Sequence, residues 1–226
     1  SKLFDEFGIL TVCDSVAGMF GEPLDVSNSK IDILCGGSQK ALSAPPGLTM
    51  VWVSDRAFET MQNRKTPIKA FYANLLFIKD YYENQWFPYT MPASDIMGLR
   101  VAIDNYLEDA EFQNRHKQLA RATRNAVEKA GLKLYLESGY SNNVTVIEIP
   151  EGITEDEILS GLRDEFGILI SGCFDVLKGK VVRIGHMGEN ANKEDIAQTL
   201  EALQKVLEAS GIKLTCNIRD EFLLAC

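Results

Sequence analysis

The chain has 226 residues, of which 46% are hydrophobic and 24% are charged, and both fractions are ordinary for a globular protein. Its 32 acidic residues outnumber its 23 basic residues, and the resulting net charge of -9 argues against a nucleic-acid partner. No apolar run approaches the roughly 20 residues that cross a bilayer, and the first residues lack the plan of a signal peptide, so we expect a cytoplasmic protein.

The five cysteines form no C-x-x-C pair and lie mostly in apolar, strand-like contexts, which predicts buried thiols rather than a disulfide framework. The two histidines, His116 and His186, are far apart in the sequence, and no metal site is predicted. The chain lacks an initiator methionine, and its first residues have the pattern of a helix end that leads into a strand. We therefore expect it to begin inside a larger domain.

Three short segments near the start, residues 9–13, 31–35 and 49–53, are almost continuously apolar. This pattern predicts strands that are buried on both faces of an α/β sheet. Asp14 directly follows the first segment, at the strand end where such sheets bind ligands. Asp14 could be a turn-forming or capping acid, since Ser15 follows it, or a carboxylate that faces a cationic ring nitrogen.

Lys40 lies between the second and third predicted strands, in the segment CGGSQKALSAPPG of residues 35–47. Most loop lysines extend into solvent. A lysine on a stiff, partly desolvated connection at the edge of a sheet can instead act as a Schiff-base nucleophile. This segment alone leaves both interpretations open.

Two helices are predicted next, one capped by Asp55 and extending to about residue 63, and one over residues 69–83. The aromatic segment 86–92 contains two prolines and cannot continue a helix.

A long helical span follows, in which Ser94 is a candidate N-cap. Apolar residues recur at helical spacing through residue 107, and a second periodic stretch over residues 119–130 ends at Gly131. We expect this span to bridge two domains.

The remainder has the pattern of a small α+β unit. Thr154 opens a capping box for a helix to about residue 166, and Asn192 caps a final helix. Strands are predicted at residues 132–136, 144–149, 168–170 and 181–184. Within the last of these strands, Arg183 must meet an anion, because an unpaired guanidinium among apolar neighbours is costly. That anion could be an acidic side chain of this chain or a substrate carboxylate.

Five motifs, taken together, carry a family resemblance: DSVA at residues 14–17, GSQKAL at 37–42, APPG at 44–47, YTMP at 89–92 and VRIG at 182–185. They resemble the class V pyridoxal-phosphate enzymes of fold type I, most closely the alanine-glyoxylate and serine-pyruvate aminotransferases. The resemblance implies an α/β fold with three parts. These are the C-terminal part of the cofactor-binding large domain with a partial sheet (residues 1–93), long bridging helices (94–131) and a small α+β C-terminal domain (132–226).

The resemblance also implies a role for each candidate site residue. Lys40 would form a Schiff base with pyridoxal 5'-phosphate and then move a proton between the substrate Cα and the cofactor. Asp14 would pair with the pyridinium nitrogen. Val16 would pack on one face of the ring, and Gln39 would lie beside the phosphate or the phenolic oxygen.

In the same pattern, Arg183 would bind the α-carboxylate of the substrate. Thr90 would reach the cofactor phosphate of a neighbouring subunit, which implies a homodimer. Cysteine desulfurases of this class have histidine where this chain has Gln39, so transamination is favoured over sulfur transfer. The family commonly has tyrosine where this chain has Phe87, and a hydroxyl contact from that position would be lost.

The implied activity is transamination between a small amino acid, such as alanine or serine, and a 2-oxo acid, glyoxylate or pyruvate. Transamination of 2-aminoethylphosphonate and a desulfurase or lyase reaction are alternatives within the class. The family's first half is missing from this sequence, so the chain is expected to be a C-terminal fragment that binds the cofactor poorly. A rival prediction is an inactive fragment that folds and self-associates through uncovered apolar surface.

Overall fold

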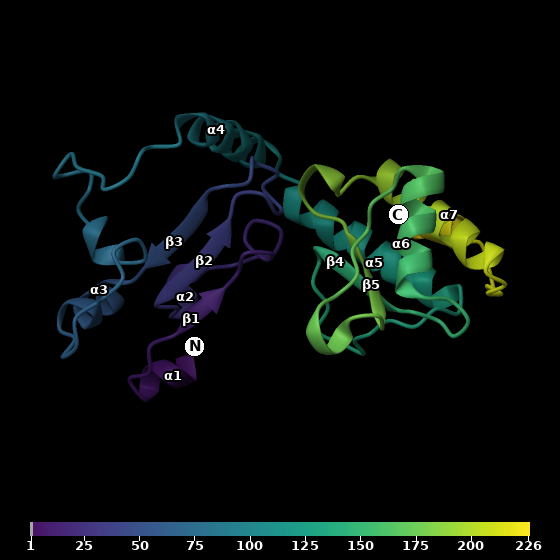
Figure 1. Cartoon of the computed structure of the whole chain (residues 1–226), viewed down its shortest axis with the longest axis horizontal. Coiled ribbons are helices and arrows are strands. Elements are labelled where there is room, and N and C mark those ends of the chain that lie inside the picture. The colour runs from purple at the N-terminus through teal and green to yellow at the C-terminus, as the bar shows by residue number, and fades with distance from the viewer. Residues whose placement is uncertain (1) are drawn as a thin grey trace.

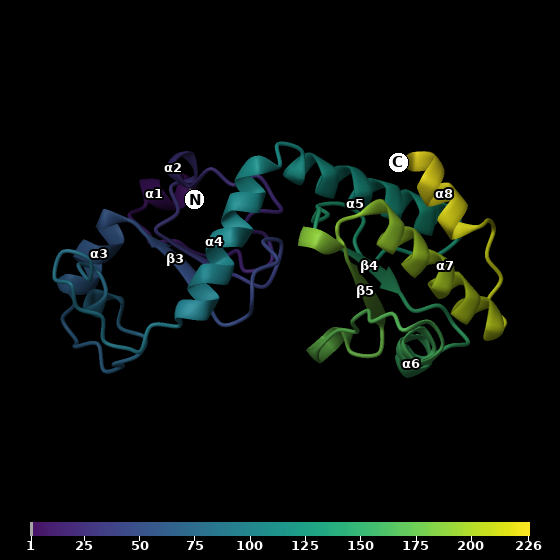
Figure 2. The same cartoon turned by 90° about the horizontal axis from the view of Figure 1, so that it is seen from above.

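Two groups of elements lie at opposite ends of the molecule (Figure 1) in the computed structural model, which describes residues 2–226. The elements in chain order are α1 (Lys2–Glu6), β1 (Val12–Asp14), α2 (Val26–Ser29), β2 (Ile33–Gly37), β3 (Thr49–Val53), α3 (Asp55–Gln62), α4 (Ala93–Glu108), α5 (Phe112–Lys129), β4 (Val144–Glu148), α6 (Glu155–Phe166), β5 (Val181–Gly185), α7 (Lys193–Ala209) and α8 (Ile218–Ala225). The N-terminal group contains β1 to β3, the C-terminal group contains β4, β5 and α5 to α8, and α4 leads from one to the other (Figure 2).

The N-terminal sheet has the order β1-β2-β3, with β1 parallel to β2 and β2 antiparallel to β3. The third predicted strand has its observed bounds, whereas the first two begin two or three residues later than predicted. The reason is Asp32, whose buried carboxylate accepts a hydrogen bond from the Thr11 N–H (2.9 Å) and binds Arg56 (2.6 Å). Because the Asp32 side chain binds the Thr11 N–H in this way, the regular pairing of β1 with β2 begins one residue later, at Val12 and Ile33.

The prediction that these strands are buried on both faces is wrong for β1 and β3. Val12 is 70% exposed and Trp52 is 42% exposed, whereas Leu34 on the central strand is buried. A strand is buried on both faces only when other elements cover the sheet. Within residues 2–226, the flanking strands of this sheet keep apolar side chains at the surface.

Two predictions about the following helices are also wrong. Ser54, rather than Asp55, caps α3, because the Ser54 hydroxyl accepts a hydrogen bond from the Ala57 N–H. Residues 69–83 contain only one 3₁₀ turn, Leu75–Phe77. The Tyr89 hydroxyl donates to main-chain carbonyls at the start of this segment, and aromatic rings along it pack on one another in place of a helical face.

The long helical span is confirmed, with different boundaries. Ser94 lies inside α4 rather than capping it, since Pro92 precedes the helix and provides no side-chain cap. The second helix, α5, begins at Phe112, seven residues before the predicted periodic stretch. Its end is as predicted, because Gly131 takes a positive φ of 86° that favours glycine.

The C-terminal group encloses the main hydrophobic core. β4 and β5 form an antiparallel pair, and α5, α6, α7 and α8 pack around it. The capping box at Thr154 and the cap at Asn192 are confirmed. α7 is not the final helix, because α8 follows and buries Phe222 completely.

Two strands predicted in this group are absent from the described residues. Segment 132–136 contributes only a single bridge, from Leu134 to Ile147, and segment 168–170 contributes none, since the next bridge joins Ser171 to Arg183. The prediction of buried thiols is also wrong in degree: all five cysteines are free, four are half-buried and Cys226 is exposed. Between residues 2 and 226, no helix is both long enough and apolar enough to cross a membrane.

Candidate active site

The carboxyl ends of β1 and β2 meet at one edge of the N-terminal sheet. Asp14 pairs with Cys35 in the ladder, and the Ser15 N–H continues it by donating to the Cys35 carbonyl (2.9 Å). One Asp14 carboxylate oxygen, Oδ1, accepts a hydrogen bond from the Val16 N–H (3.0 Å). The side chain therefore shapes a turn, and it is also exposed at the edge, where its other oxygen has no hydrogen-bond partner in the described chain.

Gly37, the last residue of β2, is closely approached from two sides. A Cβ atom there would lie 3.2 Å from Val16 Cγ1 and 2.9 Å from Gln39 Oε1. A larger residue at this position would press on Val16 and would displace the end of the Gln39 side chain. The sequence-predicted residues Asp14, Val16 and Gln39 are brought together here.

Lys40 follows in a stiff connection between β2 and β3, as predicted. The buried Ser38 hydroxyl donates to the Pro45 carbonyl (2.6 Å), and the Ala44 N–H donates to the Ser38 carbonyl (3.0 Å). A second turn inside the loop is closed by the Ser43 N–H, which donates to the Lys40 carbonyl (2.9 Å). Lys40 itself is half-buried, and these hydrogen bonds restrain the backbone of its loop.

Arg183, on β5, has no acidic partner among the ion pairs of the described residues. Its Nε donates to the Gly172 carbonyl (2.7 Å), and its guanidinium lies 5.7 Å from the centre of the exposed Phe174 ring. The prediction of an internal salt bridge therefore finds no support in residues 2–226. The remaining guanidinium N–H groups are free to bind an external anion.

Thr90 lies in the aromatic segment before α4 and is exposed. Its neighbour Tyr89 packs edge-on against Phe87, with ring centres 5.5 Å apart. No hydrogen bond or ion pair in the described chain joins Thr90 or Arg183 to Lys40. The structure thus assembles the strand-end residues and leaves these two on separate elements.

A clamp that was not predicted from the sequence joins the two groups of elements. The Glu22 carboxylate accepts hydrogen bonds from the Ser141 hydroxyl (2.8 Å), from the Asn142 side chain (2.8 Å) and from the Asn142 N–H. Asn143 adds a hydrogen bond from its side-chain amide to the Ala17 carbonyl (2.5 Å). A single acid after a glycine gives no signal for a partner about 120 residues away, so no pattern in the sequence could have predicted the clamp.

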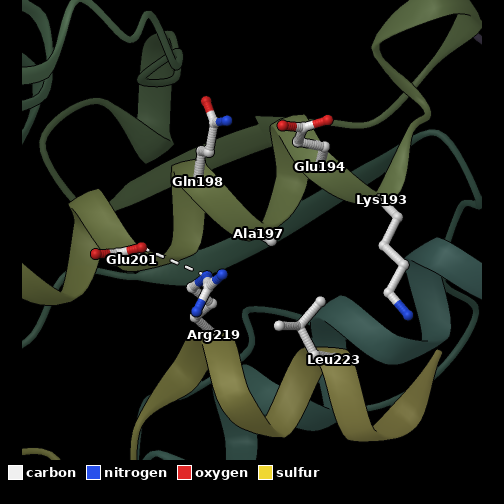
Figure 3. Close-up of a pocket in the computed structure, with 7 residues that line it drawn as sticks. All are labelled: Lys193, Glu194, Ala197, Gln198, Glu201, Arg219 and Leu223. Atoms are coloured by element: carbon white, nitrogen blue, oxygen red, sulfur yellow. Dashed lines mark ion pairs between the residues drawn. The ribbon is translucent and has the colours of Figure 1, made fainter.

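A hollow between α7 and α8 is a second candidate for a binding site (Figure 3). The residues around it are Lys193, Glu194, Ala197, Gln198, Glu201, Arg219 and Leu223. Arg219 already pairs with Glu201 across it (3.4 Å), and none of the sequence-predicted site residues lines it. Because this hollow lies in the C-terminal group, at the end of the molecule away from β1 to β3, it does not belong to the candidate site (Figure 1).

Comparison with known proteins gives a consistent result. The family model "Aminotransferase class-V" matches residues 1–199. An uncharacterised aminotransferase of Methanocaldococcus jannaschii is 36% identical over 94% of this chain and 56% of its own length. The pyridoxamine–pyruvate transaminase of Mesorhizobium japonicum is 34% identical over 99% of this chain and 58% of its own length. The alanine–glyoxylate aminotransferase of Callithrix jacchus is 32% identical over 92% of this chain and 52% of its own length.

Solved structures show the same likeness. The pyridoxamine-pyruvate aminotransferase of Mesorhizobium loti has a TM-score of 0.94 at 30% identity, over 99% of this chain and 59% of its own. The ureidoglycine-glyoxylate aminotransferase of Bacillus subtilis has a TM-score of 0.93 at 29% identity, with the same coverage. The chain spans about half the length of the curated relatives it matches.

Proposed function

Because this chain belongs to the class-V aminotransferase family, we propose that the enzyme containing it transfers an amino group between a small amino acid and a 2-oxo acid. The fold is that of the fold type I pyridoxal-phosphate enzymes, and the cofactor of the family is pyridoxal 5'-phosphate. The division into residues 1–93, 94–131 and 132–226, the homodimer and the cytoplasmic location are parts of the same proposal.

The observation that carries the proposal is the grouping of Asp14, Val16 and Gln39 at the strand ends, directly beside the stiff loop of Lys40. This edge suits an aromatic, anionic cofactor. An apolar side chain is available for a ring face, a carboxylate for a ring nitrogen and an amine for the reacting carbon. Pyridoxal phosphate, when bound, supplies a ring that withdraws electrons from the substrate Cα.

Lys40 is the residue we assign to proton movement. With pyridoxal phosphate bound, Lys40 would hold the cofactor through its amine, and that amine would move a proton between the substrate Cα and the cofactor. The hydrogen-bonded loop limits where the amine can reach. Asp14 would keep the ring nitrogen protonated, because an anionic carboxylate beside that nitrogen favours its cationic form.

Arg183 is assigned to the α-carboxylate of both amino donor and 2-oxo acceptor. Its outer N–H groups have the planar, two-pronged geometry that suits a carboxylate, and no acid in the described residues competes for them. Thr90 is assigned to the cofactor phosphate of a neighbouring subunit. Its exposed position supports this assignment.

Alanine, serine, aspartate and 2-aminoethylphosphonate are the candidate donors, with glyoxylate or pyruvate as acceptors. The names of the relatives favour glyoxylate and pyruvate, since one acts on alanine and glyoxylate and another on pyridoxamine and pyruvate. A donor–acceptor panel on the complete protein that the gene encodes selects among them. No turnover of any amino donor, with cofactor bound, would refute the proposal.

A second candidate applies to this chain by itself: a folded but inactive polypeptide. The exposed Val12 and Trp52 on the N-terminal sheet favour it, because such apolar surface promotes association. We expect the 226-residue chain to bind pyridoxal phosphate weakly and to form oligomers in size-exclusion chromatography. A cofactor-loaded, active 226-residue chain would reject this candidate.

The Lys40→Ala variant tests the central assignment. We expect transamination to fall by about 10³-fold or more, because the nucleophile and the proton carrier are both lost. Borohydride reduction followed by peptide mass spectrometry should place the cofactor mass on Lys40 in the parent protein and nowhere in the variant. Lys65→Ala is the matched control, since Lys65 is an exposed loop lysine outside the site, and it should retain normal activity.

A further inference from the structure

The turn that follows β5 lies directly against the loop of Lys40. The Glu189 N–H donates to the Ser43 hydroxyl oxygen (2.9 Å), although the two residues are 146 positions apart. Gly188 is buried in the same contact. A Cβ atom on Gly188 would lie 2.8 Å from the Ala41 carbonyl oxygen and would collide with Ser43 Oγ. The backbone of the C-terminal group therefore approaches the Lys40 loop as closely as a glycine permits.

A completely buried histidine holds this turn from the other side. His116, on α5, donates from Nδ1 to the Phe112 carbonyl (2.7 Å), and its Nε2 lies 2.8 Å from the Gly188 nitrogen. An amide N–H can only donate, so Nε2 must be the acceptor and the ring must be neutral. His116 thereby fixes the direction of the Gly188 amide, and with it the position of the following Glu189 N–H.

Ser43 links the turn after β5 to Lys40 through two hydrogen bonds. Its own N–H donates to the Lys40 carbonyl, while its hydroxyl accepts from Glu189. Ser43 also has a positive φ of 56°, a conformation that costs a residue with a Cβ atom and that needs support from its surroundings. The hydrogen bond from Glu189 provides such support.

We propose that His116 and Ser43 are positioning residues for Lys40, and that they make the C-terminal group set the placement of the reactive loop. The role given to Lys40 rests on the proposed function, whereas the contact itself does not. His116 acts through Gly188, and Ser43 acts through the Lys40 carbonyl. Neither touches substrate or cofactor.

Two pairs of variants separate positioning from general stability. His116→Phe preserves ring packing but removes the acceptor, and His116→Gln keeps an acceptor near the place of Nε2. Ser43→Ala removes the acceptor, whereas Ser43→Asn keeps one and suits a positive φ. Thr123→Ala is the control, since Thr123 is buried on the same helix and bonds only the Leu119 carbonyl.

Hydrogen exchange in the cofactor-free protein is the first readout. We expect the amides of Ser43 and Ala44 to exchange about tenfold faster in His116→Phe and Ser43→Ala, because a hydrogen bond that supports the loop is lost. His116→Gln, Ser43→Asn and Thr123→Ala should stay within about twofold of the parent rate. Unchanged exchange in Ser43→Ala would overturn the proposal. This variant is decisive even if His116→Phe unfolds, since Ser43 is exposed.

The second readout uses the complete, cofactor-loaded enzyme. We expect His116→Phe and Ser43→Ala to shift the visible absorbance of the bound cofactor and to lower kcat about tenfold with little change in KM, and the acceptor-keeping variants to restore both. Normal spectra and kcat in Ser43→Ala would also overturn the proposal. If the parent protein shows no transamination while the exchange result holds, the proposed function fails and the positioning contact stands.

Discussion

The N-terminal and C-terminal groups of elements differ in how far they bury their apolar side chains. The C-terminal group surrounds β4 and β5 with four helices and buries Phe222, Leu200 and Ile158 almost completely. The N-terminal group presents apolar residues of β1 and β3 to solvent, yet it carries Asp14 and Lys40. Stability is therefore concentrated in one region and the candidate chemistry in the other, which makes the contacts between them important for function.

The largest effect that distinguishes the two regions should come from a core truncation. Phe222→Ala removes a ring that is fully buried between helices, and we expect it to lower the free energy of unfolding by about 4 kcal/mol. Trp52→Ala, on the exposed face of β3, should cost about 1 kcal/mol or less. Chemical denaturation of both variants measures the difference, and equal losses would show that the two regions share one core.

Acid should destabilise the two regions in different pH ranges. Burial lowers the pKa of His186 in the C-terminal group to about 4, and the hydrogen bond from Arg56 lowers the pKa of Asp32 in the N-terminal group to about 2. Each lowered pKa adds stability above the unfolded-state pKa, and that stability is lost as the pH falls through the folded value. The C-terminal group should therefore weaken between about pH 6.5 and 4, and the N-terminal group between about pH 4 and 2.

The expected losses of unfolding free energy are about 3 kcal/mol from His186 and about 2 kcal/mol from Asp32, because a tenfold change in proton affinity corresponds to about 1.4 kcal/mol. Denaturation at a series of pH values measures them. His186→Gln should flatten the upper range and Asp32→Asn the lower one. Loss of stability in the upper range that persists in His186→Gln would contradict the assignment. Burial also lowers the pKa of His116, so His116 would then be the group that causes the loss of stability in that pH range.

The smallest expected effect concerns the coupling between the regions. Glu22→Ala removes the acceptor of the hydrogen bonds from Ser141 and Asn142, and we expect it to cost about 1 to 2 kcal/mol. The loss should separate unfolding into two transitions, because less remains to hold the groups together. Glu22→Gln keeps one acceptor oxygen, and its free energy of unfolding should lie between those of Glu22→Ala and the parent protein. A single unchanged transition in Glu22→Ala would show that the clamp carries no coupling.

Much of the C-terminal group could be predicted from sequence because its signals are local. Thr154, Asn192 and Gly131 each fix a helix end through hydrogen bonds or backbone angles within a few residues. Some of the failures have non-local causes. Segment 69–83 forms no long helix because its aromatic rings pack on one another and on Tyr89. The short helix α8 was not predicted although Asn217 caps it locally, and its Phe222 is buried against other helices.

For the candidate site, the family motifs in the sequence predicted Asp14, Val16, Gln39 and Lys40, which lie at or just after the ends of β1 and β2. These residues meet because β1 and β2 are parallel neighbours, so that their carboxyl ends lie at the same edge of the sheet. Only the tertiary structure decided which residues hold the Lys40 loop, since the Glu189–Ser43 contact joins positions 146 residues apart. Patterns along a chain record local geometry, whereas hydrogen bonds between distant segments arise only when the whole fold brings a donor and an acceptor within reach.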